Sequence, residues 1–371
     1  MITRRLSHII VFSGMLLLFL VFGSEIVTAQ TEFPPPPEPG IANEYCLSCH
    51  GQPDQQVILP SGEILYLTID QDKFDHSVHG ISGYACVQCH TNITDYPHPE
   101  NTAQTLREFK LDLYTNCARC HHEKYDALLD GVHAEELAKG NNEAAVCTDC
   151  HGAHYVGSPD EPRSRIPQTC ERCHSEIYNS YKHSVHGSAL IGEGNPDVPS
   201  CTDCHGSHNI EGPGAANFKL NSPLICAECH ADEELMDKYG ISTNVFDTYI
   251  ADFHGTTTTL YEPEVEGQQP NTPVCIDCHG VHDIRSPEDP QSSVMKDNLL
   301  QTCQKCHPDA ESNFQSAWLG HYEPDRDRYP LVFYVDLFYK IFIPFVLGVM
   351  VLFISTDAFR RIVKKRRERA L

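Results

Sequence analysis

Two long apolar stretches lie near the ends of the chain, and the segment between them is mostly polar. The first stretch, Ile9 to Phe22, follows Arg4 and Arg5 and precedes small residues at positions 27–29. A basic start, a short apolar run and small residues are typical of a secretory signal peptide. We therefore expect residues 1–29 to be a signal peptide cleaved before Gln30, with an uncleaved anchor as the alternative.

The second stretch, Leu331 to Ile354, is 24 residues long, which is enough to cross a bilayer as a helix. Seven basic residues follow it within residues 360–369. By the positive-inside rule, this tail lies in the cytoplasm and the rest of the chain on the periplasmic or extracellular side. The pattern predicts a transmembrane helix at residues 329–358 and a basic cytoplasmic tail at residues 359–371 of a single-pass protein of the cell membrane.

Asp336 and Lys340 interrupt this apolar stretch four residues apart, so they can pair on one helix face. Both side chains can reach the membrane interface, or they can face an integral-membrane partner. The stretch from Leu331 to Leu371 contains no histidine, so it offers no ligand pair for a b-type haem.

The polar segment shows only short elements. Residues 30–42 form a proline-rich linker, and residues 56–69 predict two short strands around the turn Pro60-Ser61-Gly62. The segments at 121–133 and 174–186 have helical spacing over about three turns. We therefore expect a fold of mainly short α-helices and loops, low in β structure.

All 18 cysteines belong to nine copies of the motif CxxCH, so none remains for a disulfide. CxxCH attaches c-type haem: the two thiols form thioethers and the adjacent histidine ligates the iron. Zinc ribbons also use paired cysteines, but they do not need a histidine directly after each pair. The sequence therefore predicts nine covalently bound c-type haems. The attaching cysteines are Cys46, Cys49, Cys86, Cys89, Cys117, Cys120, Cys147, Cys150, Cys170, Cys173, Cys201, Cys204, Cys226, Cys229, Cys275, Cys278, Cys303 and Cys306, and the proximal iron ligands are His50, His90, His121, His151, His174, His205, His230, His279 and His307.

Other histidines recur at fixed places in an internal repeat. Five belong to a motif written HSVHG in its fullest form, and four trail a CxxCH site, mostly as CxxCHGxH. Nine haems need nine distal ligands, and these two groups supply nine candidates, although each can instead be a solvent-facing or hydrogen-bonding side chain. The candidates are His79, His133, His186, His254 and His321 from the motif, and the trailing His98, His154, His208 and His282; His76, His122 and His183 are surplus. The pattern leaves open which histidine serves which haem.

Size and charge limit the possible functions. Residues 30–330, or 301 residues, leave about 33 residues for each of nine haems, too few for a protein-only core. The chain carries −24 charges, and its ends (1–29 and 331–371) contribute +1 and +5, which leaves −30 on the segment between them. Such a field repels nucleic acid and attracts basic redox proteins, although acidity also serves solubility alone.

With these motifs, residues 43–325 resemble the multihaem c-type cytochromes of the cytochrome c3-like, doubled-CxxCH class. The resemblance implies electron relay along closely packed haems, mostly with two histidine ligands each. The chain is also similar to members that carry a C-terminal membrane helix and work beside a cytochrome b-type, quinone-reactive subunit. We expect a nonahaem domain at residues 43–328, built from repeats that stack into an elongated array of haems.

Three functions remain to be compared. In the first, the protein is not an enzyme but relays electrons between the membrane quinone pool, through a quinol-oxidising cytochrome b-type subunit, and periplasmic or extracellular redox proteins. In the second, it is a catalytic oxidoreductase acting on nitrite, hydroxylamine or tetrathionate, which needs one iron with an open position. In the third, it forms extracellular haem filaments. The sufficiency of histidines favours the first.

Overall fold

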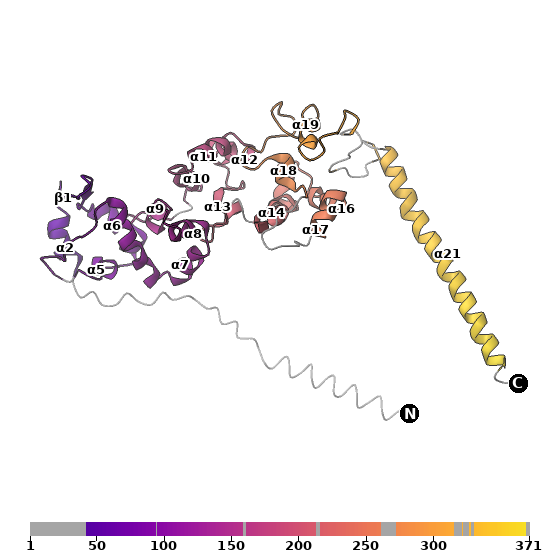
Figure 1. Cartoon of the computed structure of the whole chain (residues 1–371), viewed down its shortest axis with the longest axis horizontal. Helices are drawn as coiled ribbons and strands as arrows, with labels where there is room; N and C mark the ends of the chain where they lie inside the picture. The colour runs from indigo at the N-terminus through magenta and orange to yellow at the C-terminus, as the bar shows by residue number, and fades with distance from the viewer. Residues whose placement is uncertain are drawn as a thin grey trace, which may run out of the picture. The chain divides into compact units, whose positions relative to one another are not determined.

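The structure is a computed structural model, and it describes residues 42–93, 95–158, 161–212, 216–260, 272–314, 321, 326–327 and 330–368. The predicted signal peptide and nearly all of the proline-rich linker lie outside the described residues. The described chain is mostly helical, with many short helices and very little strand, as predicted (Figure 1). The fold class expected from the sequence is therefore confirmed.

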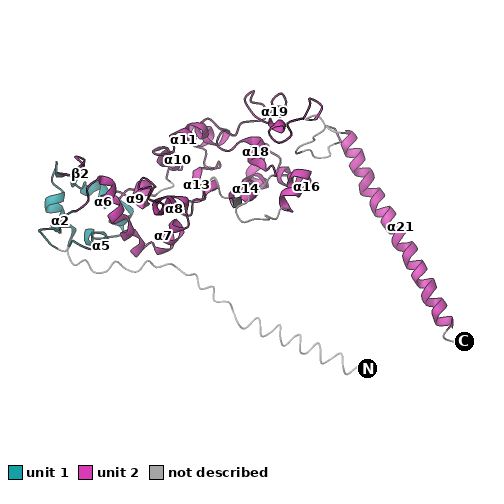
Figure 2. Cartoon of the chain, in the orientation of Figure 1, with its two compact units in different colours: residues 1–56, 66–101 teal, residues 57–65, 102–371 magenta. Residues whose placement is uncertain are grey.

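The chain divides into two compact units, one of residues 1–56 and 66–101 and one of residues 57–65 and 102–371 (Figure 2). The first unit contains the helices α2 (Asn43–His50), α3 (Gln71–Asp75), α4 (Val78–Ile81) and α5 (Cys86–Cys89). The second contains α6 (Leu106–Leu113), the 3₁₀ helix η1 (Tyr114–Arg119), α7 (His122–Leu129), α8 (Val132–Ala138), α9 (Cys147–His151), α10 (Arg165–Glu171), α11 (Ser175–Lys182), α12 (Val185–Gly187), the π-helical turn η2 (Ser188–Gly192), α13 (Cys201–His205), α14 (Ala216–His230), α15 (Glu233–Asp237), α16 (Val245–Ala251), α17 (Phe253–Thr259), α18 (Cys275–His279), α19 (Leu299–Gln304) and α21 (Pro330–Glu368).

The predicted hairpin is present as β1 (Gln56–Ile58) and β2 (Ile64–Tyr66). At its turn, the Leu59 N–H donates to the Glu63 carbonyl at 2.9 Å. Gly62 has a φ of +89°, a conformation that glycine adopts without steric cost. The hairpin is the only sheet among the described residues, so helices and loops carry every predicted haem site.

Few side chains are buried by protein alone. The largest that are fully buried are Leu190, Val274 and Pro167. Large apolar side chains next to predicted distal ligands are instead exposed: Ile81 is 74% exposed and Phe253 is 78% exposed. Protein–protein packing of this extent cannot stabilise a chain of this size, which agrees with the expectation that porphyrins form most of the core.

The two helices predicted before motif histidines are shorter than three turns. The helix α7 ends at Leu129 and α11 ends at Lys182, and a second helix begins three residues later in each case. At the second break, the Ser184 hydroxyl accepts a hydrogen bond from the Gly187 N–H at 3.0 Å and caps α12. The length prediction was therefore wrong because a new helix starts at each break, after Gly131 without a side-chain cap and after Ser184 with one, which the helical spacing alone does not reveal.

We refer to this break before a motif histidine as the histidine corner. Its glycine packs directly against the end of the preceding helix: a Cβ added to Gly187 would lie 1.9 Å from the Tyr181 carbonyl oxygen, and one added to Gly80 would lie 2.0 Å from that of Phe74. The corner of the His254 copy has the same arrangement at Gly255. The HSVHG motif thus encodes a fixed turn between two helices that directs the second histidine.

The first histidine of HSVHG has a structural role. Nδ1 of His183 donates to the Asn179 carbonyl at 2.7 Å, and Nδ1 of His76 donates to the Asp72 carbonyl at the same distance. Each bond satisfies a carbonyl in the last turn of the preceding helix. His76 and His183, two of the three histidines that are not needed as iron ligands, therefore cap the C-terminal ends of helices.

The helix α21 is long and apolar enough to cross a membrane, with a mean hydropathy of 2.4 over its most apolar window. It continues past Ile354 to Glu368, so the basic residues that the structure describes extend the same helix. The expected pair is formed, with Nζ of Lys340 2.7 Å from the Asp336 carboxylate. Helix and composition together are consistent with a single-pass membrane anchor.

Substituting Gly187 by alanine tests the histidine corner. Because the new methyl group would overlap the Tyr181 carbonyl, we expect Gly187→Ala to lower the free energy of unfolding by about 1–3 kcal/mol. A Cβ added to Gly192, five residues later, would meet no atom within 4 Å, so Gly192→Ala is the matched control and is expected to be neutral. Guanidinium unfolding of the haem-loaded protein measures both; equal losses would contradict the steric account.

Candidate haem sites

Each CxxCH motif forms a helical turn. In four of them, for example, the backbone N–H of the histidine donates to the carbonyl of the first cysteine at 2.9 Å, as His121 does to Cys117. Residues i, i+3 and i+4 share one face of a helix, so both thiols and the proximal imidazole project from the same side. Covalent attachment of a haem with an adjacent axial ligand requires this placement.

In the sites followed by a trailing histidine, a side chain fixes the start of the turn. The carboxylates of Asp149, Asp203 and Asp277 accept the backbone N–H three residues earlier, at 3.0, 2.6 and 2.7 Å. Gln88 does the same with its amide oxygen, at 2.6 Å. These bonds satisfy a donor that the helix leaves unpaired, so each attaching turn is held at its first residue.

The structure brings fourteen of the eighteen predicted iron ligands together in pairs, each pair joining a proximal and a distal histidine. The separations of the ring centres are 5.8–6.4 Å. The pairs are His50 with His98, His151 with His208, His174 with His133, His205 with His282, His230 with His186, His279 with His321, and His307 with His254.

These separations fit iron between the rings. A metal–imidazole bond of about 2.0 Å plus about 1.2 Å from nitrogen to ring centre, taken on both sides, gives about 6.4 Å. Rings packed directly face to face would lie much closer together. The paired histidines therefore fit the two axial positions of one haem iron, and the proximal member of each pair is adjacent to its two attaching cysteines.

Five of the seven pairs follow a rule that counting does not show. A motif histidine pairs with the plain CxxCH site of the next repeat, as His133 does with His174 and His186 with His230. A trailing histidine pairs with the previous site of its own kind, as His208 does with His151. The exceptions are His98, which faces His50 of the plain site in its own repeat, and His321, which faces His279. In six of the seven pairs the two histidines therefore lie in different repeats, and no local sequence signal identifies them.

The other four predicted ligands are divided between the two compact units. His79 and His90 belong to the first unit, and His121 and His154 belong to the second. Each has contacts in the structure. Their ligation stays a prediction.

The surroundings suit neutral imidazole. Burial and the neighbouring His230 lower the pKa of His186 to about 4. Burial is also the first cause of the lowered pKa of His133, His205, His230, His279, His282 and His321. Neutral imidazole is the form that binds metal, so these histidines are ready to ligate at neutral pH.

Sites that follow one another in the second unit are in contact through their cysteines. The first cysteines of successive sites lie close together: Cys117 near Cys147, Cys170 near Cys201, and Cys226 near Cys275. Between these pairs, Cys150 lies near Cys170, Cys204 near Cys226, and Cys278 near Cys303. The seven sites from Cys117 to Cys306 therefore form one unbroken series.

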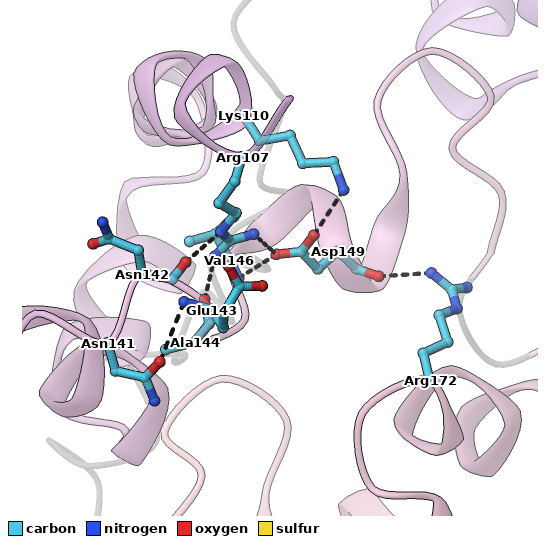
Figure 3. Close-up of polar contacts among 9 residues, drawn as sticks. All are labelled: Arg107, Lys110, Asn141, Asn142, Glu143, Ala144, Val146, Asp149 and Arg172. Carbon is cyan, nitrogen blue, oxygen red and sulfur yellow. Dashed lines mark hydrogen bonds and ion pairs between the residues drawn. The ribbon is translucent and has the colours of Figure 1, made fainter. Parts of the chain in front are cut away.

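Three cations approach Asp149, which lies within the CxxCH site that begins at Cys147 (Figure 3). Arg107 and Lys110 on α6 contact the two oxygens of Asp149, at 2.6 and 3.1 Å. Arg107 also donates to the carbonyls of Asn142 and Ala144. Burial alone would raise the pKa of Asp149, but hydrogen bonds from the Val146 N–H and these two cations outweigh it and lower the pKa.

The zinc alternative has no support in the described residues. There, no three or more histidine, cysteine or acidic side chains converge as they would to hold a metal ion. A structural zinc site needs four such ligands. The structure instead presents facing imidazoles.

Family models match two parts of this region. The model described as cytochrome c3 matches residues 140–231, and the model described as cytochrome c7 and related cytochrome c matches residues 72–152. These matches identify a multihaem c-type cytochrome. Covalently bound haem iron and electron transport, as predicted from the motifs, are the properties of this class. No curated protein and no solved structure matches the chain.

The pairing of His186 with His230 can be tested at the iron. If His186 is the distal ligand of the haem attached at Cys226 and Cys229, as its position facing His230 predicts, we expect His186→Ala to make one iron per chain high-spin. Electron paramagnetic resonance of the oxidised protein measures the change.

His183→Ala is the matched control, since it lies in the same corner but bonds the Asn179 carbonyl. It should cost about 0.5–1.5 kcal/mol of stability and leave every iron low-spin. A high-spin iron in His183→Ala, or none in His186→Ala, would contradict the assignment.

Proposed function

We propose that this cytochrome is a membrane-anchored nonahaem protein that relays electrons between the membrane quinone pool and periplasmic or extracellular redox proteins. The unbroken series of sites from Cys117 to Cys306 carries the proposal. Electron transfer needs haems that are close to one another and whose irons do not bind a substrate. The series of sites supports the first condition, and the paired imidazoles support the second. His79, His90, His121 and His154 supply the ligands of the remaining two haems.

The paired histidines also bear on the catalytic alternative. An enzyme acting on nitrite, hydroxylamine or tetrathionate needs an iron with an open position. The least regular repeats contain the distal candidates His98 and His321. Their ring centres lie 5.8 Å from that of His50 and 6.3 Å from that of His279, respectively. This geometry supports relay rather than catalysis.

The membrane helix suggests where electrons enter or leave. The last site ends at His307, 24 residues before Leu331. A quinol-oxidising, cytochrome b-type subunit beside α21 would exchange electrons there, and the Asp336–Lys340 pair offers it a polar contact within the apolar helix. The acidic segment of −30 charges would attract basic redox partners at the other haems.

Haem content and spin state test whether the chain carries nine haems and whether every iron has two axial ligands. We expect pyridine haemochrome analysis to give nine haems per chain, and the spectrum of the oxidised protein to be entirely low-spin. Fewer haems, or turnover of nitrite, hydroxylamine or tetrathionate by the purified protein, would reject the proposal.

Reduction by quinol tests the partner. In vesicles that contain the full chain and a cytochrome b-type subunit, a short-chain quinol should reduce the haems in a time course that is absent when the subunit is left out. Equal reduction rates in both vesicles would remove the membrane subunit from the proposal.

A further inference from the structure

The residue directly before the second cysteine differs in charge from site to site. In the sites with a trailing histidine it is acidic or neutral, and in the plain sites it varies more widely. Arg172 and Glu228 occupy this position in consecutive plain sites, so equivalent places carry opposite charges. The full set is Ser48, Arg119, Arg172, Glu228 and Lys305 in the plain sites, and Gln88, Asp149, Asp203 and Asp277 in the others.

Arg172 lies between two successive sites, those at Cys147 and Cys170, which we call the Arg172 junction. Its guanidinium Nη1 donates to the Asp149 carbonyl at 2.8 Å, next to Cys150 (Figure 3). It directly precedes Cys173 in the sequence and lies near both Cys150 and Cys170. One cation therefore acts on two haem attachments.

The rest of the Arg172 junction adds positive charge. Arg107 and Lys110 contact Asp149 there, and Glu171 adjoins Arg172 in the sequence. Three cations against two carboxylates leave one positive charge, in a segment whose overall charge is strongly negative.

Glu228 lies between the sites at Cys201 and Cys226, which we call the Glu228 junction. It adjoins Cys229 in the sequence and lies near Cys204. Asp203 and Asp232 act on Cys229 as well, and Arg163, which is 2.7 Å from Asp203, is the opposing cation. Three carboxylates against one cation leave two negative charges.

The third junction, between the sites at Cys275 and Cys303, is cationic again. Lys305 occupies the equivalent position and interacts with Cys278. Asp277 is compensated by Lys219 at 3.2 Å. The sign of the local charge thus runs positive, negative, positive along the series of sites.

Reduction adds an electron to a haem, so a nearby cation stabilises the reduced form and a nearby anion destabilises it. We propose that Arg172 and Glu228 set a step in reduction potential along the relay, with higher potentials at the Arg172 junction and lower potentials at the Glu228 junction. The inference rests on the proposed relay function. Arg172 and Glu228 are both exposed, so solvent and salt screen the effect and keep it moderate.

The test is a redox titration of the full-length, haem-loaded protein followed by its absorbance. Arg172→Gln should lower the most positive components, and Glu228→Gln should raise the most negative ones. We expect a three- to tenfold change in the ratio of reduced to oxidised haem, or ~28–59 mV for a one-electron couple. Both shifts should shrink in high salt. Arg361→Gln on α21, which removes a cation paired with Asp357, is the null control.

Arg172→Lys separates charge from hydrogen bonding, because it keeps the charge and should leave the titration unchanged. If Arg172→Lys shifted the potentials as much as Arg172→Gln, or if Arg172→Gln and Glu228→Gln shifted them in the same direction or not at all, the proposal would be overturned. Haem content and spin state of the wild-type protein are measured alongside. A deficit there would count against the relay function, whereas missing shifts with nine low-spin haems would count against the potential step alone.

Discussion

The separation of about 6 Å between the centres of two paired imidazole rings is the constraint on which this molecule depends. In six of the seven pairs the two rings come from different repeats, as His186 and His230 do, so these pairs tie distant parts of the chain together. Under the proposed ligation, metal binding stabilises only the folded arrangement, so it acts on folding as well as on redox chemistry. It takes the place that a hydrophobic core or disulfides hold in other small domains.

Local hydrogen bonds supply the rigidity that large-scale packing does not. The corner at Ser184 and Gly187 fixes the direction of one histidine, and the carboxylate of Asp203 fixes the start of an attaching turn. These devices recur in other repeats, with Asp252 replacing the serine before His254. A ligand held in this way needs no rearrangement when the iron changes its charge, which favours rapid electron exchange.

Charge is distributed on two scales. The acidic excess lies between the two apolar stretches, in residues 30–330, and its field reaches beyond any single contact. Cations such as Arg107 and Arg172 are placed singly beside the sites, where their neighbours are haem attachments. In the proposed relay, the first scale would act on encounter with redox proteins and the second on the energy of an electron within the chain.

The sequence by itself determined the chemistry, because covalent attachment of haem needs two thiols and an imidazole within five consecutive residues. It also predicted the hairpin at Gly62, the membrane helix and the mostly helical fold, whose signals are all local. It overestimated the length of the helix at 174–186, since the capping by Ser184 competes with helical spacing. Only the tertiary structure decided that His133 faces His174 and that Arg172 reaches Asp149, because ligands and charges from different repeats meet only when the repeats pack.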